Sequence, residues 1–294
     1  MKIIVLGKNG QVGWELQRTL APLGQVIALG RQELELSNEQ AIRQVVRDIS
    51  PDLIINAAAY TAVDRAEEEP DLAMAINGTA PGIIAEEAAR CQAALIHYST
   101  DYVFDGNQER PYTEEDRPNP INVYGKSKLA GEEAIRRTGV KHLIFRTSWV
   151  YSLRGKNFLL TILRLARDKE ELSIVNDQFG APTWSRMIAL ATAQVIAISG
   201  GKINSSHHSL YHLSSAGQTT WHDFAAAILA DSSRFLEKLP VLKAISTAEY
   251  PVKAARPHCS LLDNSLFQQH FHLNLPDWKS SLDLVLDDLW RGHA

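Results

Sequence analysis

Short apolar runs alternate in the first half of the chain with longer segments whose apolar residues recur every three or four positions. The runs predict strands at Ile3–Leu6, Val26–Leu29, Leu53–Asn56, Ala94–Ser99 and Leu143–Thr147. The longer segments predict helices at Val12–Leu20, from a capping sequence at Ser37–Gln40 to Ile49, at Ala80–Cys91 and around Tyr124. Short apolar strands alternating with amphipathic helices are typical of a parallel sheet covered on both faces. We therefore expect an α/β, doubly wound fold of the Rossmann type.

The pattern changes after about Trp149. Helices are predicted at Phe158–Arg167 and Met187–Ile198, short strands at Leu172–Val175 and Leu210–Leu213, and irregular structure at Pro240–Pro257. We expect residues 1–148 to form the sheet domain, with parts of 170–215 completing the sheet. Residues 149–294 are then mainly a smaller C-terminal subdomain that binds the substrate.

The composition is that of an ordinary globular chain. Of the 294 residues, 45% are hydrophobic and 22% are charged, and the formal net charge of −4 argues against general affinity for nucleic acid. Two cysteines, Cys91 and Cys259, are too few for a disulfide framework. No apolar stretch approaches membrane-spanning length, and the N-terminal run is too short for a signal peptide. The composition therefore predicts a cytoplasmic protein without membrane or nucleic-acid partners.

A glycine-rich segment, Gly7-Lys8-Asn9-Gly10-Gln11-Val12-Gly13, follows the first predicted strand and opens the first predicted helix. Gly7 allows a tight turn, Gly10 allows a pyrophosphate to approach the backbone, and Gly13 lets the helix pack closely on the sheet. The spacing is G-x-x-G-x-x-G rather than G-x-G-x-x-G, and the alternative is a plain strand-to-helix turn. Its position after the first strand favours a site for NADH or NADPH.

The end of the second predicted strand bears on which of these cofactors binds. A carboxylate there binds the 2′-hydroxyl of NAD, whereas an arginine accommodates the 2′-phosphate of NADP. Arg31 stands at this place, which favours NADPH. Glu33 and Glu35 follow closely and leave the preference open.

Tyr124 and Lys128 are four residues apart on a predicted helix, so their side chains lie on one face. The lysine ammonium would lower the pKa of the phenol and make it useful for proton transfer near neutral pH. The hydroxyl of Thr100 would hold a substrate oxygen beside the phenol. A two-residue match is weak, and the alternative is an amphipathic helix with an exposed lysine and a half-buried tyrosine.

Several longer strings together carry a resemblance to a known family. They are Gly7–Gly13, Asn56–Asp64, Ser99–Gly106, Asn122–Glu132, Arg146–Tyr151, Asn176–Thr183 and Arg256-Pro257. The chain resembles the extended short-chain dehydrogenases/reductases and, within them, the dTDP-4-dehydrorhamnose reductases. The resemblance runs nearly end to end.

The resemblance implies the NAD(P)H-dependent reduction of the 4-keto group of dTDP-4-dehydro-β-L-rhamnose to dTDP-L-rhamnose, a precursor of cell-surface polysaccharide such as O-antigen. The implied catalytic residues are Tyr124 as general acid, Lys128 and Thr100. The expected cofactor-binding residues are Gly7, Gly10, Gln11, Val12, Gly13, Arg31, Glu35, Leu36, Ala59, Tyr60, Thr61, Tyr124 and Lys128. The expected substrate-binding residues are Thr100, Asp101, Trp149 and Arg256.

The resemblance also bears on metal binding and assembly, because some family members are dimers bridged by Mg²⁺ through glutamates. Glu15 matches one such position, but Arg186 stands where another acid would be, and a cation there opposes Mg²⁺. We therefore expect no metal ligands and a monomer or weak homodimer. His207, His208 and His212 show no spacing typical of a metal site.

Three alternatives remain beside the reductase. The nucleotide-sugar 4,6-dehydratases place a catalytic carboxylate after Thr-Asp, but Tyr102 follows Asp101 here. Nucleotide-sugar epimerases share the Tyr–Lys pair and are disfavoured by the family strings alone. A non-catalytic, NADP-binding protein resembling the regulatory subunit of methionine adenosyltransferase is disfavoured by the presence of Thr100, Tyr124 and Lys128.

Overall fold

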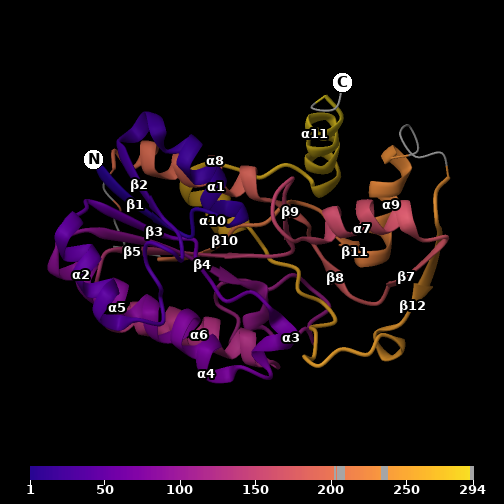
Figure 1. Ribbon diagram of the computed structural model, residues 1–294, viewed down its shortest axis with the longest axis horizontal. Helices are drawn as coiled ribbons and strands as arrows, with labels where there is room; N and C mark the ends of the chain where they lie inside the picture. The colour runs from indigo at the N-terminus through magenta and orange to yellow at the C-terminus, as the bar shows by residue number, and fades with distance from the viewer. Residues whose placement is uncertain (202, 204–208, 233–237, 292–294) are drawn as a thin grey trace.

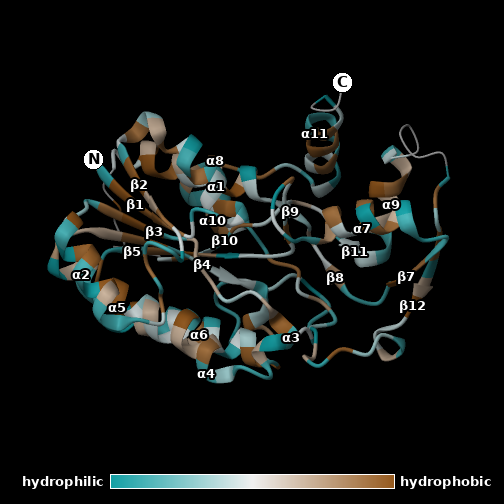
Figure 2. Cartoon of the chain, viewed as in Figure 1, coloured by the Kyte–Doolittle hydropathy of each residue, from teal (hydrophilic) through white to brown (hydrophobic). Residues whose placement is uncertain are grey.

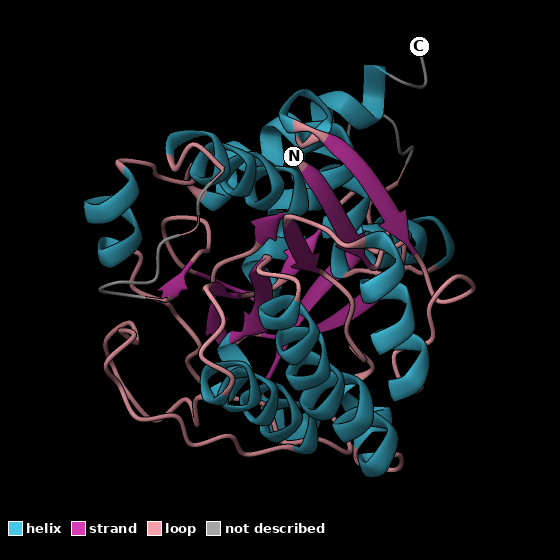
Figure 3. Ribbon diagram, turned by 90° about the vertical axis from the view of Figure 1, so that its left-hand side faces the viewer, coloured by secondary structure: helices cyan, strands magenta, loops and turns pink. Residues whose placement is uncertain are grey.

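A six-stranded parallel sheet lies between two layers of helices in the computed structural model, which describes residues 1–201, 203, 209–232 and 238–291 (Figure 1). The sheet has the order β10-β5-β4-β3-β1-β2. Its strands are β1 (Lys2–Leu6), β2 (Gln25–Leu29), β3 (Leu53–Asn56), β4 (Ala94–Thr100), β5 (His142–Thr147) and β10 (Leu210–His212). The predicted doubly wound α/β fold is confirmed, and Figure 3 shows the sheet enclosed by helices from a second direction.

Alternate residues of the strands face the two helical layers, as the pleat of a strand requires. Ile3, Ile55 and Ile96 face the layer of α1 (Gln11–Thr19), α8 (Ser185–Ile198) and α10 (Ser265–Phe271). Ile54 and Leu95 face the layer of α2 (Glu39–Ile49), α5 (Ala80–Arg90) and α6 (Val123–Arg137). The strands are largely apolar on both faces for this reason, and Figure 2 shows much of β1, β2 and β3 in the brown of hydrophobic residues.

The helix starts follow local capping chemistry. Asn38 caps α2 by accepting a hydrogen bond from the Ala41 N–H, as the capping sequence predicted. Between β3 and α5 lie elements that the hydrophobic pattern did not predict. They are α3 (Val63–Ala66), α4 (Pro70–Met74) and the π-helical segment η2 (Ala75–Thr79). Single π turns often occur at functional sites.

The second half of the chain forms a smaller unit beside the sheet (Figure 1). Its core is formed largely by α7 (Phe158–Asp168), α9 (Trp221–Ser232) and α11 (Trp278–Arg291). Three two-stranded sheets accompany them: β6 (Val150–Tyr151) with β9 (Thr183–Trp184), β7 (Glu171–Val175) with β12 (Val241–Ile245), and β8 (Phe179–Gly180) with β11 (Thr219–Thr220). Short 3₁₀ turns lie at η1 (Ala21–Leu23), η3 (Asp101–Val103) and η4 (Thr247–Glu249).

The structure corrects one element prediction in this half. The segment Pro240–Pro257 was expected to be irregular, but it contains β12 and η4. Most residues of β12 are exposed, so the strand lacks the apolar run from which a buried strand is predicted. Of the two strands predicted in residues 170–215, β10 joins the main sheet beside β5, whereas β7 pairs with β12 outside it. No helix within the described residues is long and apolar enough to cross a membrane.

Candidate active site

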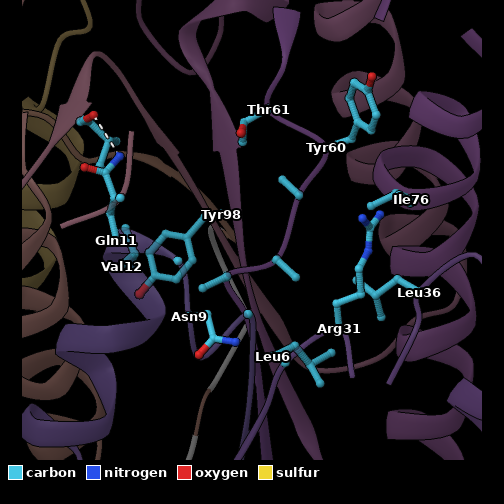
Figure 4. A pocket seen from close by; sticks show the side chains of 18 of the residues that line it. Leu6, Asn9, Gln11, Val12, Arg31, Leu36, Tyr60, Thr61, Ile76 and Tyr98 are labelled. Carbon is cyan, nitrogen blue, oxygen red and sulfur yellow. Dashed lines mark hydrogen bonds between the residues drawn. The ribbon is translucent and has the colours of Figure 1, made fainter. Parts of the chain in front are cut away.

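A cavity of about 610 Å³ opens at the carboxyl ends of β1, β2, β3 and β4. Ligands of open parallel sheets bind at this edge. Of the thirteen residues expected to bind a cofactor, all but Gly13 line the cavity. Figure 4 shows Gln11, Val12 and Tyr98 on one side and Arg31, Leu36 and Ile76 on the other. Five of the seven strings that carry the family resemblance thus contribute residues to the lining of this one cavity.

The glycine loop has the close approaches that its spacing predicted. Gly7 has a φ of +85°, and a Cβ there would lie 2.8 Å from the Ala58 nitrogen. A Cβ on Gly13 would collide with the carbonyl oxygen of Gly7. Gly13 does not line the cavity itself. It contributes to the cavity indirectly, by letting α1 pack closely against the loop. The loop leaves its backbone and the N-terminus of α1 accessible to a pyrophosphate, so these residues fit a dinucleotide.

Gln11 ties the glycine loop to a segment from the second half of the chain. Its Oε1 accepts hydrogen bonds from the Ser152 hydroxyl and from Asn157 Nδ2, each at 2.9 Å, and its Nε2 donates to the Val150 carbonyl. These contacts hold residues 150–157 beside the cavity, where Gly155 and Lys156 join its lining. Sequence reasoning missed Gly155 and Lys156, because contacts between residues about 140 positions apart leave no local pattern.

The charged groups after β2 are already paired. Lys8 Nζ lies 2.6 Å from Glu33, and this contact, together with the Gly30 N–H, lowers the pKa of the Glu33 carboxyl. Arg31 Nε lies 2.9 Å from Glu35, while 70% of the Arg31 side chain stays exposed. Glu33 is held by Lys8 and the backbone, whereas the Arg31 guanidinium, although paired with Glu35, is largely exposed and lines the cavity, so it can reach a ligand phosphate.

The loop after β3 is fixed by an asparagine of the π-helical segment. Asn77 Oδ1 accepts from the Tyr60 N–H at 2.8 Å, and Asn77 Nδ2 donates to the Tyr60 carbonyl at 2.9 Å and to Ser127 Oγ at 3.1 Å. Ser127 lies on α6 between Tyr124 and Lys128. Asn77 therefore links the loop that carries Ala59, Tyr60 and Thr61 to the helix of the Tyr–Lys pair. Sequence reasoning did not single it out.

Tyr124 and Lys128 both line the cavity from one face of α6, whose first turn is capped by Asn122. Lys128 is 2% exposed, and burial lowers the pKa of its ammonium to about 8. Its Nζ donates to the Tyr98 carbonyl at 2.7 Å. The pair therefore belongs to the cavity, and the reading of an exposed surface lysine is wrong.

The pKa of Tyr124 moves opposite to the expectation from sequence. Burial raises the pKa of the phenol to about 12, the charge of Asp101 adds to the rise, and contact with Thr100 opposes it. Burial outweighs the fall that the spacing with Lys128 predicted, and the Lys128 Nζ donates to the Tyr98 carbonyl in this arrangement. A phenol with a raised pKa stays protonated at neutral pH and so holds a proton to donate.

Thr100 and Asp101 stand at the end of β4 beside Tyr124. The Thr100 hydroxyl donates to Asp101 Oδ1 at 2.9 Å and accepts from the Tyr102 N–H at 3.2 Å. Asp101 is 2% exposed, and burial raises the pKa of its carboxyl to about 6 against hydrogen bonds from Ser260 and Thr100. Its Oδ2 has no hydrogen-bond partner among the described residues. A buried polar atom of this kind is costly unless something pairs with it.

Two expected substrate residues lie farther from the cavity. Trp149 stacks on Trp221 with ring centroids 3.5 Å apart, and the edge of its indole lies against Gly180. Arg256 donates to Asp64 Oδ2 at 2.7 Å and to the Ala254 carbonyl. None of Thr100, Asp101, Trp149 and Arg256 lines the cavity described above. Their roles toward a substrate remain predictions.

The two positions that the family resemblance relates to Mg²⁺ binding, Glu15 and Arg186, form an ion pair. Arg186 Nε lies 3.4 Å from Glu15, and Arg186 Nη1 lies 2.6 Å from Asp288. Across the part of the chain that the structure describes, no group of three or more His, Cys, Asp or Glu side chains could hold a metal ion. His212 is buried, with Nδ1 3.0 Å from the Tyr112 carbonyl, and His207 and His208 lie outside the described residues.

The parallel sheet, the glycine loop and the Tyr–Lys pair that lines the same cavity define a short-chain dehydrogenase/reductase of the extended type. Residues 1–291 match the family described as RmlD substrate binding domain. The chain belongs to this family.

Similar proteins agree with this assignment. The chain is 48% identical over 300 residues to the dTDP-4-dehydrorhamnose reductase of Escherichia coli strain K12, and the match covers 100% of both chains. It is similar to the crystal structure of a dTDP-4-dehydrorhamnose reductase from Bacillus anthracis in complex with NADP, with a TM-score of 0.89, 36% identity and coverage of 98% and 99% of the two chains. A UDP-glucose 4-epimerase from Thermotoga maritima, 17% identical over 100% of both chains with a TM-score of 0.82, shares the fold.

Proposed function

We propose that this chain reduces the 4-keto group of dTDP-4-dehydro-β-L-rhamnose to give dTDP-L-rhamnose, with NADPH as the reductant. The observation that carries the proposal is a protonated phenol beside Thr100, half-buried in the wall of a cavity that fits a dinucleotide. The full-length likeness to curated reductases of this sugar nucleotide supports the substrate. The NADP named with the Bacillus anthracis structure supports the cofactor.

Bound NADPH would supply a hydride to the carbonyl carbon of the sugar. The carbonyl oxygen then becomes an alkoxide, which needs a proton donor and a positive field. Tyr124 donates its phenolic proton to this oxygen, and Thr100 holds the oxygen beside the phenol. When Lys128 is protonated, its charge favours the phenolate that remains. These roles agree with the raised pKa of Tyr124 and with its contact with Thr100.

The same residues distinguish the reductase from its alternatives. Tyr102 occupies the place where a dehydratase would need a carboxylate, and burial with the charge of Asp101 raises the pKa of its phenol. Tyr102 is thus a neutral aromatic group that meets the ring of Tyr124 edge-on at 5.7 Å. It supplies no base for elimination. We further propose that the chain acts as a monomer or weak homodimer, which the Glu15–Arg186 pair supports.

The assay is direct. Purified protein with NADPH and dTDP-4-dehydro-β-L-rhamnose should oxidise NADPH and yield dTDP-L-rhamnose, followed by loss of NADPH absorbance and by chromatography of the sugar nucleotide. Binding of NADPH without turnover would favour a non-catalytic binding protein. Interconversion of sugar nucleotides without net NADPH oxidation would favour an epimerase.

Cofactor preference should depend on Arg31. In Arg31→Ala we expect the KM for NADPH to rise by roughly tenfold or more, because a hydrogen-bonded pair with a phosphate contributes about 1.5–3 kcal/mol. The KM for NADH should change little, since NADH has no 2′-phosphate. Arg65→Ala is the matched control, because Arg65 also lines the cavity, is as exposed as Arg31 and is likewise paired with a glutamate, but lies on α3 and not at the end of β2. Equal effects of Arg31→Ala on both cofactors would contradict this assignment.

A further inference from the structure

A buried histidine touches Lys128 from below the cavity. Residues 95, 97 and 99 of β4 face α6, because side chains alternate along a strand. His97 is 0% exposed, and its Nε2 lies 3.3 Å from Lys128 Nζ. Ser99, two residues on, donates to Glu132, one turn beyond Lys128. His97 does not line the cavity, so a role in catalysis would act through Lys128.

The other ring nitrogen of His97 meets Asn56. The two residues are register partners on β4 and β3, and Asn56 Nδ2 lies 3.1 Å from His97 Nδ1. The orientation of the amide is fixed by the backbone, because Asn56 Oδ1 accepts from the Ala58 N–H at 3.2 Å. A backbone N–H only donates, so the oxygen must face it and the amide NH₂ must face His97. Asn56 is 1% exposed, so its amide is shielded from solvent.

These contacts fix the tautomer of the His97 imidazole. Because the Asn56 NH₂ donates to Nδ1, the single proton of a neutral imidazole sits on Nε2, which faces Lys128. Burial and the charge of Lys128 hold the pKa of His97 well below its usual range, so the ring stays neutral. An Nε2–H can donate to a lysine amine but cannot accept from an ammonium. Protonation of Lys128 therefore leaves the Nε2–H facing an ammonium, unless the imidazole proton moves to Nδ1, against Asn56.

We propose that His97, oriented by Asn56, is a positioning residue that holds Lys128 Nζ in place and favours its neutral amine over its ammonium. The proposal rests on the role of Lys128 in the proposed function. His97 thereby sets the upper pH at which Lys128 still carries the charge that favours the Tyr124 phenolate.

Other titratable groups act on the same place. On α6, Glu132 raises the pKa of Lys128 and is itself paired with Arg146 of β5. His142 of β5 and Lys128 both lower the pKa of His97. Tyr124 of α6 and Asp101 of η3 complete the set beside the cavity. The variants below leave all of these groups unchanged.

The first test is the pH dependence of kcat/KM. In His97→Gln the side-chain carbonyl can accept from the ammonium, so we expect the alkaline limb to move up by about one pH unit, the size of one charged hydrogen bond. In Asn56→Asp a carboxylate oxygen faces Nδ1, so the imidazole proton should move to Nδ1. Nε2 can then accept a hydrogen bond from the Lys128 ammonium, and the alkaline limb should again move to higher pH. His212→Gln is the matched control, a second histidine that is 0% exposed and lies away from Lys128.

The second test needs no turnover, so its failure is distinct from failure of the proposed function. Nitrogen-15 NMR of the histidine rings reports which nitrogen carries the proton, and His97→Gln identifies the His97 signal by its loss. Above the alkaline limb, the wild-type ring should carry its proton on Nε2, and in Asn56→Asp on Nδ1. A wild-type proton on Nδ1 at high pH would overturn the proposal. So would alkaline limbs of His97→Gln and Asn56→Asp that coincide with that of the wild type.

Discussion

The Tyr124→Phe variant should bind NADPH as the wild type does and lose about 10²- to 10⁴-fold in kcat, the usual contribution of a positioned general acid. The change removes one hydroxyl from a half-buried ring and leaves the cavity wall in place. The other two tyrosines that line the cavity within the described residues have hydroxyls engaged elsewhere: Tyr98 shares a hydrogen bond with Thr192 on α8, and Tyr60 donates to Glu69. Cofactor binding by fluorescence titration and steady-state turnover separate the two effects.

The control for this variant is Tyr98→Phe. Tyr98 lines the same cavity, but its hydroxyl lies 2.7 Å from Thr192 Oγ1, on the side of the sheet covered by α8. Loss of this hydroxyl should cost about 1 kcal/mol of stability and leave kcat within a few-fold of the wild type. Turnover in Tyr124→Phe equal to that in Tyr98→Phe would refute Tyr124 as the acid.

Replacing Arg146 with methionine should cost about 3–5 kcal/mol of unfolding free energy, because it leaves a buried carboxylate without its partner. Arg146 and Glu132 are 1% and 0% exposed, and two hydrogen bonds of 2.9 and 2.7 Å join them. Despite burial, Arg146 and the Ser99 hydroxyl lower the pKa of Glu132. The contribution of the pair is therefore present above the ordinary pKa of a glutamate and is lost as the pH falls through the lowered value.

Urea unfolding at neutral and acid pH measures this effect. Arg136→Ala is the matched control, because Arg136 approaches the same carboxylate at 3.6 Å but is 43% exposed, and exposed pairs contribute less than about 1 kcal/mol. The double variant Glu132→Gln/Arg146→Met should recover part of the loss, since no charge is then left unpaired. A cost in Arg146→Met no larger than that in Arg136→Ala would show that the buried pair does not stabilise the fold.

Elements whose signal is local were predicted well. The five strands of the first half of the chain were found within two residues of their bounds, because a strand buried on both faces must be continuously apolar. The start of α2 followed from the Asn38 cap. The strand β12 was missed for the converse reason. Most of its side chains are exposed, so it does not need a run of apolar residues.

The fold class, the glycine loop and the Tyr124–Lys128 spacing were predictable from local sequence, because each depends on residues that are close together in the chain. Tertiary structure alone decided the electrostatic state of the site. Burial, which depends on packing between distant segments, raised the pKa of Tyr124 where the spacing with Lys128 had predicted a fall. Packing also set His97 against Lys128 and Gln11 against Ser152, contacts that span 31 and 141 positions of the chain.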